Sequence, residues 1–170
     1  RLWIKKYNAL CEKMILRVGL QHSKDLAAVL ARALHIGQSV SDVRTFSATD
    51  VKAFVQLTGD SNPIHTEELS AQKAGFCAPL LPGILVASLF PAIIGSKFPG
   101  TVYASQTLSF RNPALVGQTV KATVTVRRVN GRWVTFKTAA VLQGTGQIIV
   151  EGDALALLPG DDTELRLEVS

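Results

Sequence analysis

The segment between Leu80 and Gly95 constrains the fold more than any other part of the sequence. It carries no charged residue, and its apolar side chains are spread over every side of a helix. A helix with no polar face must be surrounded by other protein, so we expect this one to be buried on all sides. It is too short, and too often interrupted by Pro and Gly, to span a membrane. The fold therefore needs a second layer that surrounds a central helix.

Prolines fix where this helix can begin and end. Pro82-Gly83 suits a helix start, where N–H groups lack intrahelical partners in any case. Pro91 lies further in, where a proline costs about 3 kcal/mol. We therefore expect a kink or an early end near Phe90.

After this segment the chain has the two-residue period of β-strands. Residues 118–127 alternate cleanly, with four apolar side chains on one face: Val120, Ala122, Val124 and Val126. In 101–111 the same period places five side chains on one face: Val102, Ala104, Gln106, Leu108 and Phe110. Asn130-Gly131 predicts a hairpin turn, and we expect further strands over 133–142 and 147–158. An apolar helix followed by antiparallel strands predicts a single α+β domain whose sheet wraps around the helix.

Shorter elements are expected upstream of the apolar segment. Residues 38–47 are predicted to form a first strand. Thr49 or Asp50 is predicted to cap a short helix over 51–57, and a second short helix is expected over 66–74. The stretch between these two helices carries the candidate chemistry.

That stretch places an acidic residue and a histidine five positions apart, in the order Gly59-Asp60-Ser61-Asn62-Pro63-Ile64-His65. Pro63 fixes its own φ and moves Asn62 out of the helical region, and Gly59 suits the end of the preceding helix. A rigid turn at a helix exit can direct a carboxylate and an imidazole at one point, as acid/base chemistry on a water molecule requires. The alternative is a loop whose Asp and His only satisfy local backbone groups. The motif by itself favours neither.

The charge of the chain is unevenly distributed. Residues 1–37 contain seven Lys and Arg against two acidic residues, whereas 38–170 contain eleven of each. The folded part is therefore neutral, and the net charge of +5 does not indicate a nucleic-acid-binding domain. The basic segment 1–37 has the character of a mitochondrial transit peptide, the alternative being an extra surface helix. We expect it to precede a domain over 38–159 and a polar tail over 160–170.

Several other kinds of chemistry lack their motifs. Cys11 and Cys77 are too few for a disulfide framework, and Cys77 has no nucleophile motif around it. His65 has no Cys/His cluster beside it, so we expect no zinc site. A Gly-x-Ser-x-Gly elbow is absent from the sequence, which argues against a serine hydrolase.

The sequence around the Asp and His resembles a family signature. The chain reads Phe54-Val55-Gln56-Leu57-Thr58-Gly59-Asp60-Ser61-Asn62-Pro63-Ile64-His65. It is similar to the aromatic residue and the Gly-Asp-x-Asn-Pro-hydrophobic-His core of the MaoC-like (R)-specific enoyl-thioester hydratases, which have the hot-dog fold. Residues 83–90 resemble the start of that family's central helix, and 105–110 resemble the strand that follows. The resemblance covers about residues 45–159.

The resemblance implies roles for individual residues. Those implied as catalytic are Asp60, His65 and Gly83, and those expected to contact the substrate are Asn62, Pro82 and Ile84. The carboxylate and the imidazole are expected to hold and activate a water, while the glycine N–H polarises the thioester carbonyl. The family usually has His where this chain has Pro82. No metal or other cofactor is implied.

The chemistry is coherent with these roles. Adding water across the C2–C3 double bond of an enoyl thioester develops negative charge on the carbonyl oxygen, which a backbone donor at a helix N-terminus can stabilise. One proton must leave the water and another must reach C2, so a carboxylate paired with an imidazole suffices.

The resemblance implies a hydro-lyase that interconverts (R)-3-hydroxyacyl and trans-2-enoyl thioesters. With a transit-like N-terminus, it implies the dehydration step of mitochondrial type II fatty-acid synthesis on acyl-carrier protein, or the same reaction on acyl-CoA. Thioester hydrolysis is an alternative that the intact Asp60/His65 signature argues against. A non-catalytic acyl-binding or scaffolding protein is another, which Pro82 favours. We expect a homodimer because the sheet leaves an exposed edge strand, and neither nucleic acid nor membrane as a partner.

Overall fold

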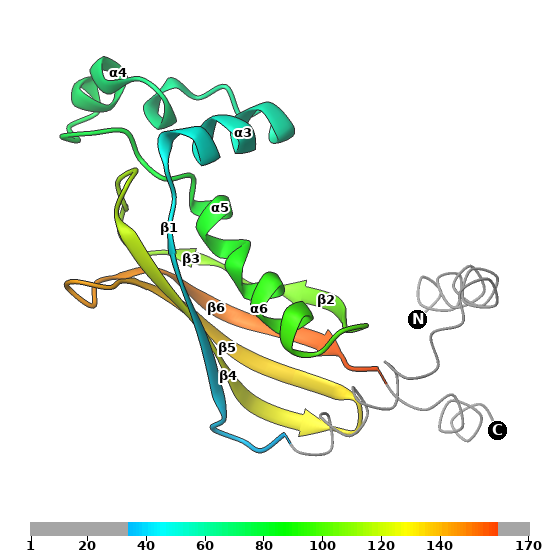
Figure 1. Ribbon diagram of the computed structural model, residues 1–170. Coiled ribbons are helices and arrows are strands. Elements are labelled where there is room, and N and C mark those ends of the chain that lie inside the picture. Colours follow the sequence, from blue (N-terminus) through cyan, green and yellow to red (C-terminus); the bar gives the residue numbers. More distant parts are fainter. Residues whose placement is uncertain (1–33, 160–170) are drawn as a thin grey trace.

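The computed structural model describes residues 34–159, so most of the expected transit segment and the expected tail lie outside the described residues. The elements follow one another as β1 (Ser39–Thr45), α3 (Ala48–Thr58), the 3-10 helix η1 (Pro63–His65), α4 (Glu68–Lys73), α5 (Gly83–Ala87), α6 (Leu89–Lys97), β2 (Val102–Gln106), β3 (Ser109–Phe110), β4 (Thr119–Asn130), β5 (Trp133–Leu142) and β6 (Ile148–Leu157). Figure 1 shows α5 and α6 running along one face of the sheet, with α3 and α4 beyond its end.

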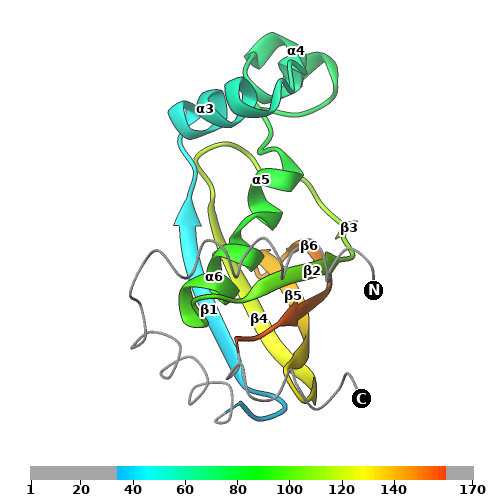
Figure 2. The same ribbon diagram turned by 90° about the vertical axis from the view of Figure 1, so that its right-hand side faces the viewer.

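Six strands form one antiparallel sheet in the order β1-β4-β5-β6-β2, and β3 also pairs with β6. The sheet curves around the α5–α6 segment, as the two views in Figures 1 and 2 show. The α+β architecture expected from the sequence, a single domain with an antiparallel sheet around a central helix, is confirmed. Both β1 and the β2–β3 segment lie at edges of this sheet.

The core lies between the sheet and the central helix. The four alternating side chains predicted on β4 are all buried: Val120, Ala122, Val124 and Val126. They pack in one cluster with Phe136 of β5 and with Phe90 and Ile94 of α6, of which Phe90 is fully buried. Burying a side chain of this size contributes about 1.5–3 kcal/mol. The described residues before β1 also pack on the domain, because Leu34 contacts the core and Gly37 N donates to Val126 O (2.8 Å).

The central helix is not buried on all sides, contrary to expectation. The side chain of Ile84 is 55% exposed, and Ser88 and Ala92 are exposed at the same four-residue spacing. One stripe of the helix therefore faces away from the sheet. The sequence could not show this because its exposed positions carry apolar or small residues like the buried ones.

The break in this helix comes earlier than predicted. Helix α5 ends at Ala87 and α6 begins at Leu89, so the expected break is present at Ser88, two residues before Phe90. Proline has no N–H to donate, and the break places Pro91 in the first turn of α6. First-turn N–H groups have no intrahelical partner, so a proline in this turn removes no helical hydrogen bond.

Helix α3 is capped by Ser47, not by Thr49 or Asp50 as expected. Asp50 N donates to Ser47 Oγ (3.2 Å), and Ser47 N donates to Asp50 Oδ2 (2.8 Å). This reciprocal pair is a capping box, and the bonds from Ser47 lower the pKa of the Asp50 carboxyl. The helix consequently starts at Ala48, three residues earlier than predicted. Helix α4 is shorter than the predicted 66–74.

The predicted faces of 101–111 are wrong at the start of β2. The register shifts between Tyr103 and Ser105, so Tyr103 packs against the core while Val102 is exposed. The Tyr103 hydroxyl donates to Gln106 Oε1, and Gln106 Nε2 donates to Thr138 Oγ1 (3.1 Å). Burial raises the pKa of Tyr103 to about 12. A bulge inserts one residue, so a strict two-residue period cannot describe this strand.

The hairpin between β4 and β5 is confirmed, but its turn is shifted by one residue. Asn130 pairs with Trp133, so the two central residues are Gly131 and Arg132. Gly131 has φ 54, and no residue other than glycine has a positive φ among those described. This fits a type II′ turn, which needs glycine only at its first central position.

Candidate active site

The Asp60 loop is held by bonds from its own residues. Gly59 ends α3 with φ 75, and its N–H donates to Val55 O (2.9 Å). Asn62 Oδ1 accepts from Ile64 N (3.3 Å) and so caps η1, while Asn62 N donates to Asp60 Oδ1 (3.3 Å). The Asn62 side chain, expected from the resemblance to contact the substrate, is thus engaged in shaping the loop.

The ring of His65 has a defined orientation. Its Nδ1 lies 2.9 Å from the carbonyl oxygen of Leu80. A carbonyl oxygen can only accept, so Nδ1 carries the hydrogen of the neutral ring, and Nε2 is left as an acceptor. The side chain is 14% exposed, so only a small part of the ring is open to solvent.

His65 Nε2 lies 3.8 Å from Asp60 Oδ2. This is too long for a direct hydrogen bond, and in the neutral tautomer both atoms are acceptors. Two acceptors at this separation suit a water molecule, which can donate one hydrogen to each of them. Its oxygen lone pairs then remain available for reaction. Asp60, with 40% of its side chain exposed, leaves this position accessible.

A short segment ties this pair to the start of the central helix. Leu80 N donates to Ile64 O (3.0 Å), and Leu80 O holds the His65 ring. On its other side the segment is held by Leu81 N, which donates to Ala114 O (2.8 Å). Gly83 follows three residues after Leu80, so the His65 ring and the first turn of α5 are fixed to the same piece of backbone.

The N–H of Gly83 lies in the first turn of α5, where no intrahelical partner exists. Pro82 precedes it as the N-cap residue and makes no side-chain cap bond. Because α5 has only five residues, its dipole is short, and the donor role expected for Gly83 depends on this free N–H. Pro82 is buried, whereas Ile84 is exposed beside the glycine.

The six residues expected in the site therefore form two groups. Asp60, His65 and Asn62 share one loop, while Pro82, Gly83 and Ile84 start α5, and Leu80 connects the two groups. Sequence reasoning missed Leu80, which acts through its carbonyl and leaves no side-chain signal. It also missed Phe110, whose ring lies against Gly83: a Cβ on Gly83 would come within 2.5 Å of Phe110 Cε1. Only the pairing of β3 with β6 reveals this contact.

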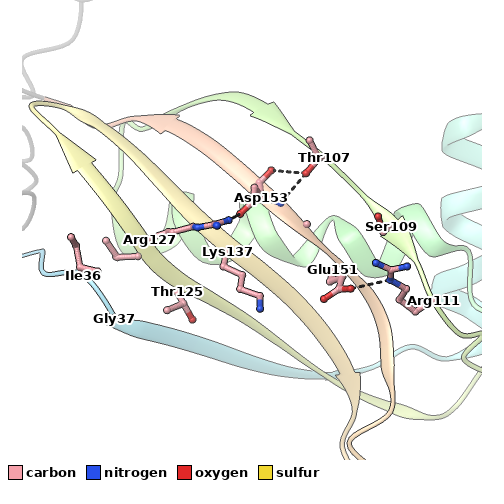
Figure 3. Close-up of a pocket in the computed structure, with 12 residues that line it drawn as sticks. Ile36, Gly37, Thr107, Ser109, Arg111, Thr125, Arg127, Lys137, Glu151 and Asp153 are labelled. Atoms are coloured by element: carbon pink, nitrogen blue, oxygen red, sulfur yellow. Dashed lines mark hydrogen bonds and ion pairs between the residues drawn. The ribbon is translucent and has the colours of Figure 1, made fainter.

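A separate hollow of about 600 Å³ lies on the face of the sheet opposite the central helix (Figure 3). Two ion pairs cross it, Arg111–Glu151 and Arg127–Asp153, each at 2.9 Å, and Lys137 lies between them. None of the six expected site residues lines it. Five charged side chains line this hollow and it is open to solvent, whereas small-molecule sites are usually enclosed and carry few polar groups.

Neither a metal centre nor a membrane span is found in the described part of the chain. Residues 34–159 contain no group of three or more His, Cys, Asp and Glu placed to hold a metal ion. Among their helices, none is both long and apolar enough to cross a membrane.

The antiparallel sheet around a central helix defines a hot-dog protein, with the loop of Asp60 and His65 beside the start of that helix. A family model described as a MaoC like domain matches residues 33–147. The chain belongs to this MaoC-like family.

Named relatives narrow the class. The chain is 36% identical over 141 residues to the mitochondrial 3-hydroxyacyl-(acyl-carrier-protein) dehydratase of Solanum lycopersicum, with 81% of this chain and 86% of the relative covered. It is 34% identical over 155 residues to the corresponding protein of Arabidopsis thaliana, covering 88% and 93%. It is 37% identical over 133 residues to the (R)-specific enoyl-CoA hydratase of Aeromonas caviae, covering 76% and 98%.

Solved structures agree with this assignment. The (R)-hydratase from A. caviae has a TM-score of 0.72 at 35% identity, with 75% of this chain and 99% of that chain covered. An R-hydratase from Pseudomonas aeruginosa also has a TM-score of 0.72, at 28% identity, covering 77% and 86%. The family, the hot-dog fold and the hydro-lyase class expected from the sequence are confirmed.

Proposed function

We propose that the protein interconverts (R)-3-hydroxyacyl and trans-2-enoyl thioesters by removing or adding water, with Asp60 and His65 as the acid/base pair. The observation that carries the proposal is the placement of Asp60 Oδ2 and His65 Nε2 3.8 Å apart, with the other ring nitrogen of His65 on the Leu80 carbonyl, so that in the neutral ring both atoms accept. Such a pair orients one water by both of its hydrogens. The relatives named dehydratase and hydratase support the same reaction.

In the hydration direction the water oxygen bonds to C3 of the enoyl thioester. One water proton passes to His65 Nε2, and the π electrons of the C2–C3 bond move onto the carbonyl oxygen as an enolate. When the carbonyl re-forms, C2 takes the proton from the imidazolium, so the ring returns to its neutral state. The carboxylate of Asp60 stabilises the positive ring while the proton is held there.

The enolate oxygen needs a donor at the moment when charge develops on it. Within residues 34–159 the N–H of Gly83 donates to no partner, and a donor fixed in place before the reaction costs no reorganisation. Leu80 connects this donor to the His65 ring by three residues of backbone. The Gly83 N–H and the His65 ring are therefore held at a fixed distance and orientation relative to each other.

For the cellular role, we assign the dehydration step of mitochondrial fatty-acid synthesis on an acyl-carrier protein. The names of the two plant relatives, both mitochondrial and both acting on that carrier, support it. The basic composition of residues 1–37 supports it independently. Relatives from Rhodospirillum rubrum and Aeromonas caviae named enoyl-CoA hydratases favour acyl-CoA as the second candidate carrier.

A non-catalytic acyl-binding protein is the alternative outside catalysis. Pro82, in place of the family histidine, is the feature that favours it. Because Pro82 is buried and acts as the N-cap of α5, its position supports a packing role rather than a missing catalytic group.

The test follows enoyl absorbance with crotonyl thioesters of CoA and of acyl-carrier protein. We expect the wild-type chain to hydrate at least one of them. Asp60→Asn and His65→Gln should each lower turnover by at least about 10²-fold, because His65 transfers the proton as general base and acid and Asp60 orients the water and stabilises the charged ring. Asn is isosteric with Asp, and Gln keeps a polar side chain that can still donate to the Leu80 carbonyl, so the melting temperature should change little. Near wild-type turnover in either variant would contradict the assignment of that residue.

A further inference from the structure

Two large apolar side chains are exposed on either side of Gly83. Ile84 follows it in the chain and is 55% exposed, and Phe110 reaches it from β3 and is 54% exposed. Single exposed apolar residues are common on protein surfaces. Ile84 and Phe110, however, both lie beside the Gly83 N–H that the proposed reaction uses, where an exposed apolar side chain can contact the substrate.

The contact between Phe110 and Gly83 is close and specific. A Cβ built on Gly83 would lie 2.5 Å from Phe110 Cε1 and 2.7 Å from Cδ1. The ring therefore occupies the space that a side chain at position 83 would need. Gly83 and Phe110 are sterically complementary, and the ring forms a wall next to the Gly83 peptide.

The backbone that carries Phe110 is anchored on both sides. Thr107 N donates to Asp153 O (2.9 Å), and Asp153 N donates to Thr107 Oγ1 (2.9 Å). Beyond the ring, Arg111 N donates to Ile149 O (2.8 Å), and the Arg111 side chain pairs with Glu151 (2.9 Å; Figure 3). Although β3 is only two residues long, the ring is attached to a fixed piece of chain.

We infer that Phe110 determines specificity by limiting the space beside C2 of the acyl thioester. This rests on the proposed function, in which the thioester oxygen accepts from Gly83 N–H. C2 is bonded to the carbonyl carbon, so it lies within a few ångströms of that donor and of the wall beside it. Phe110 consequently admits the flat, unbranched enoyl unit and excludes a substituent on C2.

The experiment compares kcat/KM for crotonyl thioester and for its 2-methyl-branched analogue. One methyl group in an apolar pocket changes kcat/KM by about 10 to 200-fold, so we expect discrimination of this size in the wild type. Phe110→Ala should reduce the ratio at least about tenfold by admitting the branched substrate. Val43→Ala, which trims an exposed apolar side chain on β1 at the other edge of the sheet, should leave the ratio unchanged.

A second measurement tests the contact itself. Gly83→Ala should lower the melting temperature and the activity in the wild-type background, because its methyl group meets the ring. The same substitution in the Phe110→Ala background should cost much less of both. An equal cost in both backgrounds would show that the ring does not occupy this space and would overturn the inference.

Other outcomes separate this inference from the function on which it depends. An active wild type with an unchanged ratio in Phe110→Ala would overturn only the role of Phe110. If Phe110→Ala raises KM equally for both substrates, the ring contacts the part of the substrate beyond the thioester rather than C2. If Phe110→Ala changes the mass in solution, the ring contacts a second copy of the chain. Each of these also overturns the assignment to C2. A wild type inactive on every thioester would overturn the proposed function itself.

Discussion

Gly83 is constrained by two separate physical demands. The proposed mechanism requires its N–H to remain free as a donor, and its α-carbon has to carry no side chain because the Phe110 ring lies against it. A substitution at this position therefore changes sterics and hydrogen bonding together. Only a comparison of two variants that share the steric change can separate them.

Gly83→Pro and Gly83→Ala form such a pair, since both add a Cβ facing Phe110 but only the proline removes the N–H. Pro82 already has φ −57 and ψ 125, a conformation that a following proline accepts. We expect turnover in the proline variant to be about 10² to 10³ lower than in the alanine variant, the usual cost of one oxyanion donor. Thermal melts of both variants provide the control. Equal turnover in the two would remove Gly83 N–H from the mechanism.

At the level of elements, the segment that joins β2 to β3 lies very close to Gly152 of β6. A Cβ on Gly152 would overlap the backbone carbonyl oxygen of Thr107. Backbone atoms held by sheet hydrogen bonds cannot move aside as the end of a flexible side chain can. The absence of a side chain at this one position lets the chain that carries Phe110 lie flat on β6.

Gly152→Ala is therefore expected to destabilise the fold by about 1–3 kcal/mol, as overpacking typically does. This corresponds to a fall in melting temperature of several degrees for a chain of this size. Gly144→Ala is the matched control, because a Cβ there meets no atom within 4 Å and no positive φ is required. Equal melting temperatures for the two variants would show that the strand crossing is looser than the structure indicates.

At the scale of the whole molecule, the sheet ends in an open edge. Among the described residues, strand β2 pairs with β6 on one side only, and its Val102 is 40% exposed. The exposed stripe of the central helix contains Ile84, Ser88 and Ala92. An unpaired edge with apolar side chains is a liability that proteins commonly cover, so we propose that a second copy of the chain covers this edge.

Light scattering at micromolar concentration should then give about twice the chain mass of 18.2 kDa. Val102→Lys, which places a charge on the exposed edge, should shift the mass toward that of one chain. Val43→Lys on the other edge strand is the control and should leave the mass unchanged. A monomeric wild type, or a mass insensitive to Val102→Lys, would contradict edge pairing through β2.

The sequence by itself determined the architecture, and its resemblance to a family signature indicated the reaction class. An apolar helix requires a surrounding layer, alternation specifies strands, and Pro63 between Asp60 and His65 specifies a rigid turn. These are local rules, in which residue type and spacing decide the outcome. The family signature depends on the same residues, which is why the fold and the hydro-lyase class could be predicted.

Tertiary structure alone decided which groups meet across the chain. The Leu80 carbonyl that selects the His65 tautomer has no side-chain signature, and the Phe110–Gly83 contact depends on the pairing of β3 with β6. The exposed stripe of the central helix and the bulge at Tyr103 likewise follow from how curved layers pack. Such contacts depend on three-dimensional geometry between distant segments, and hydrophobicity patterns along one segment carry no information about it.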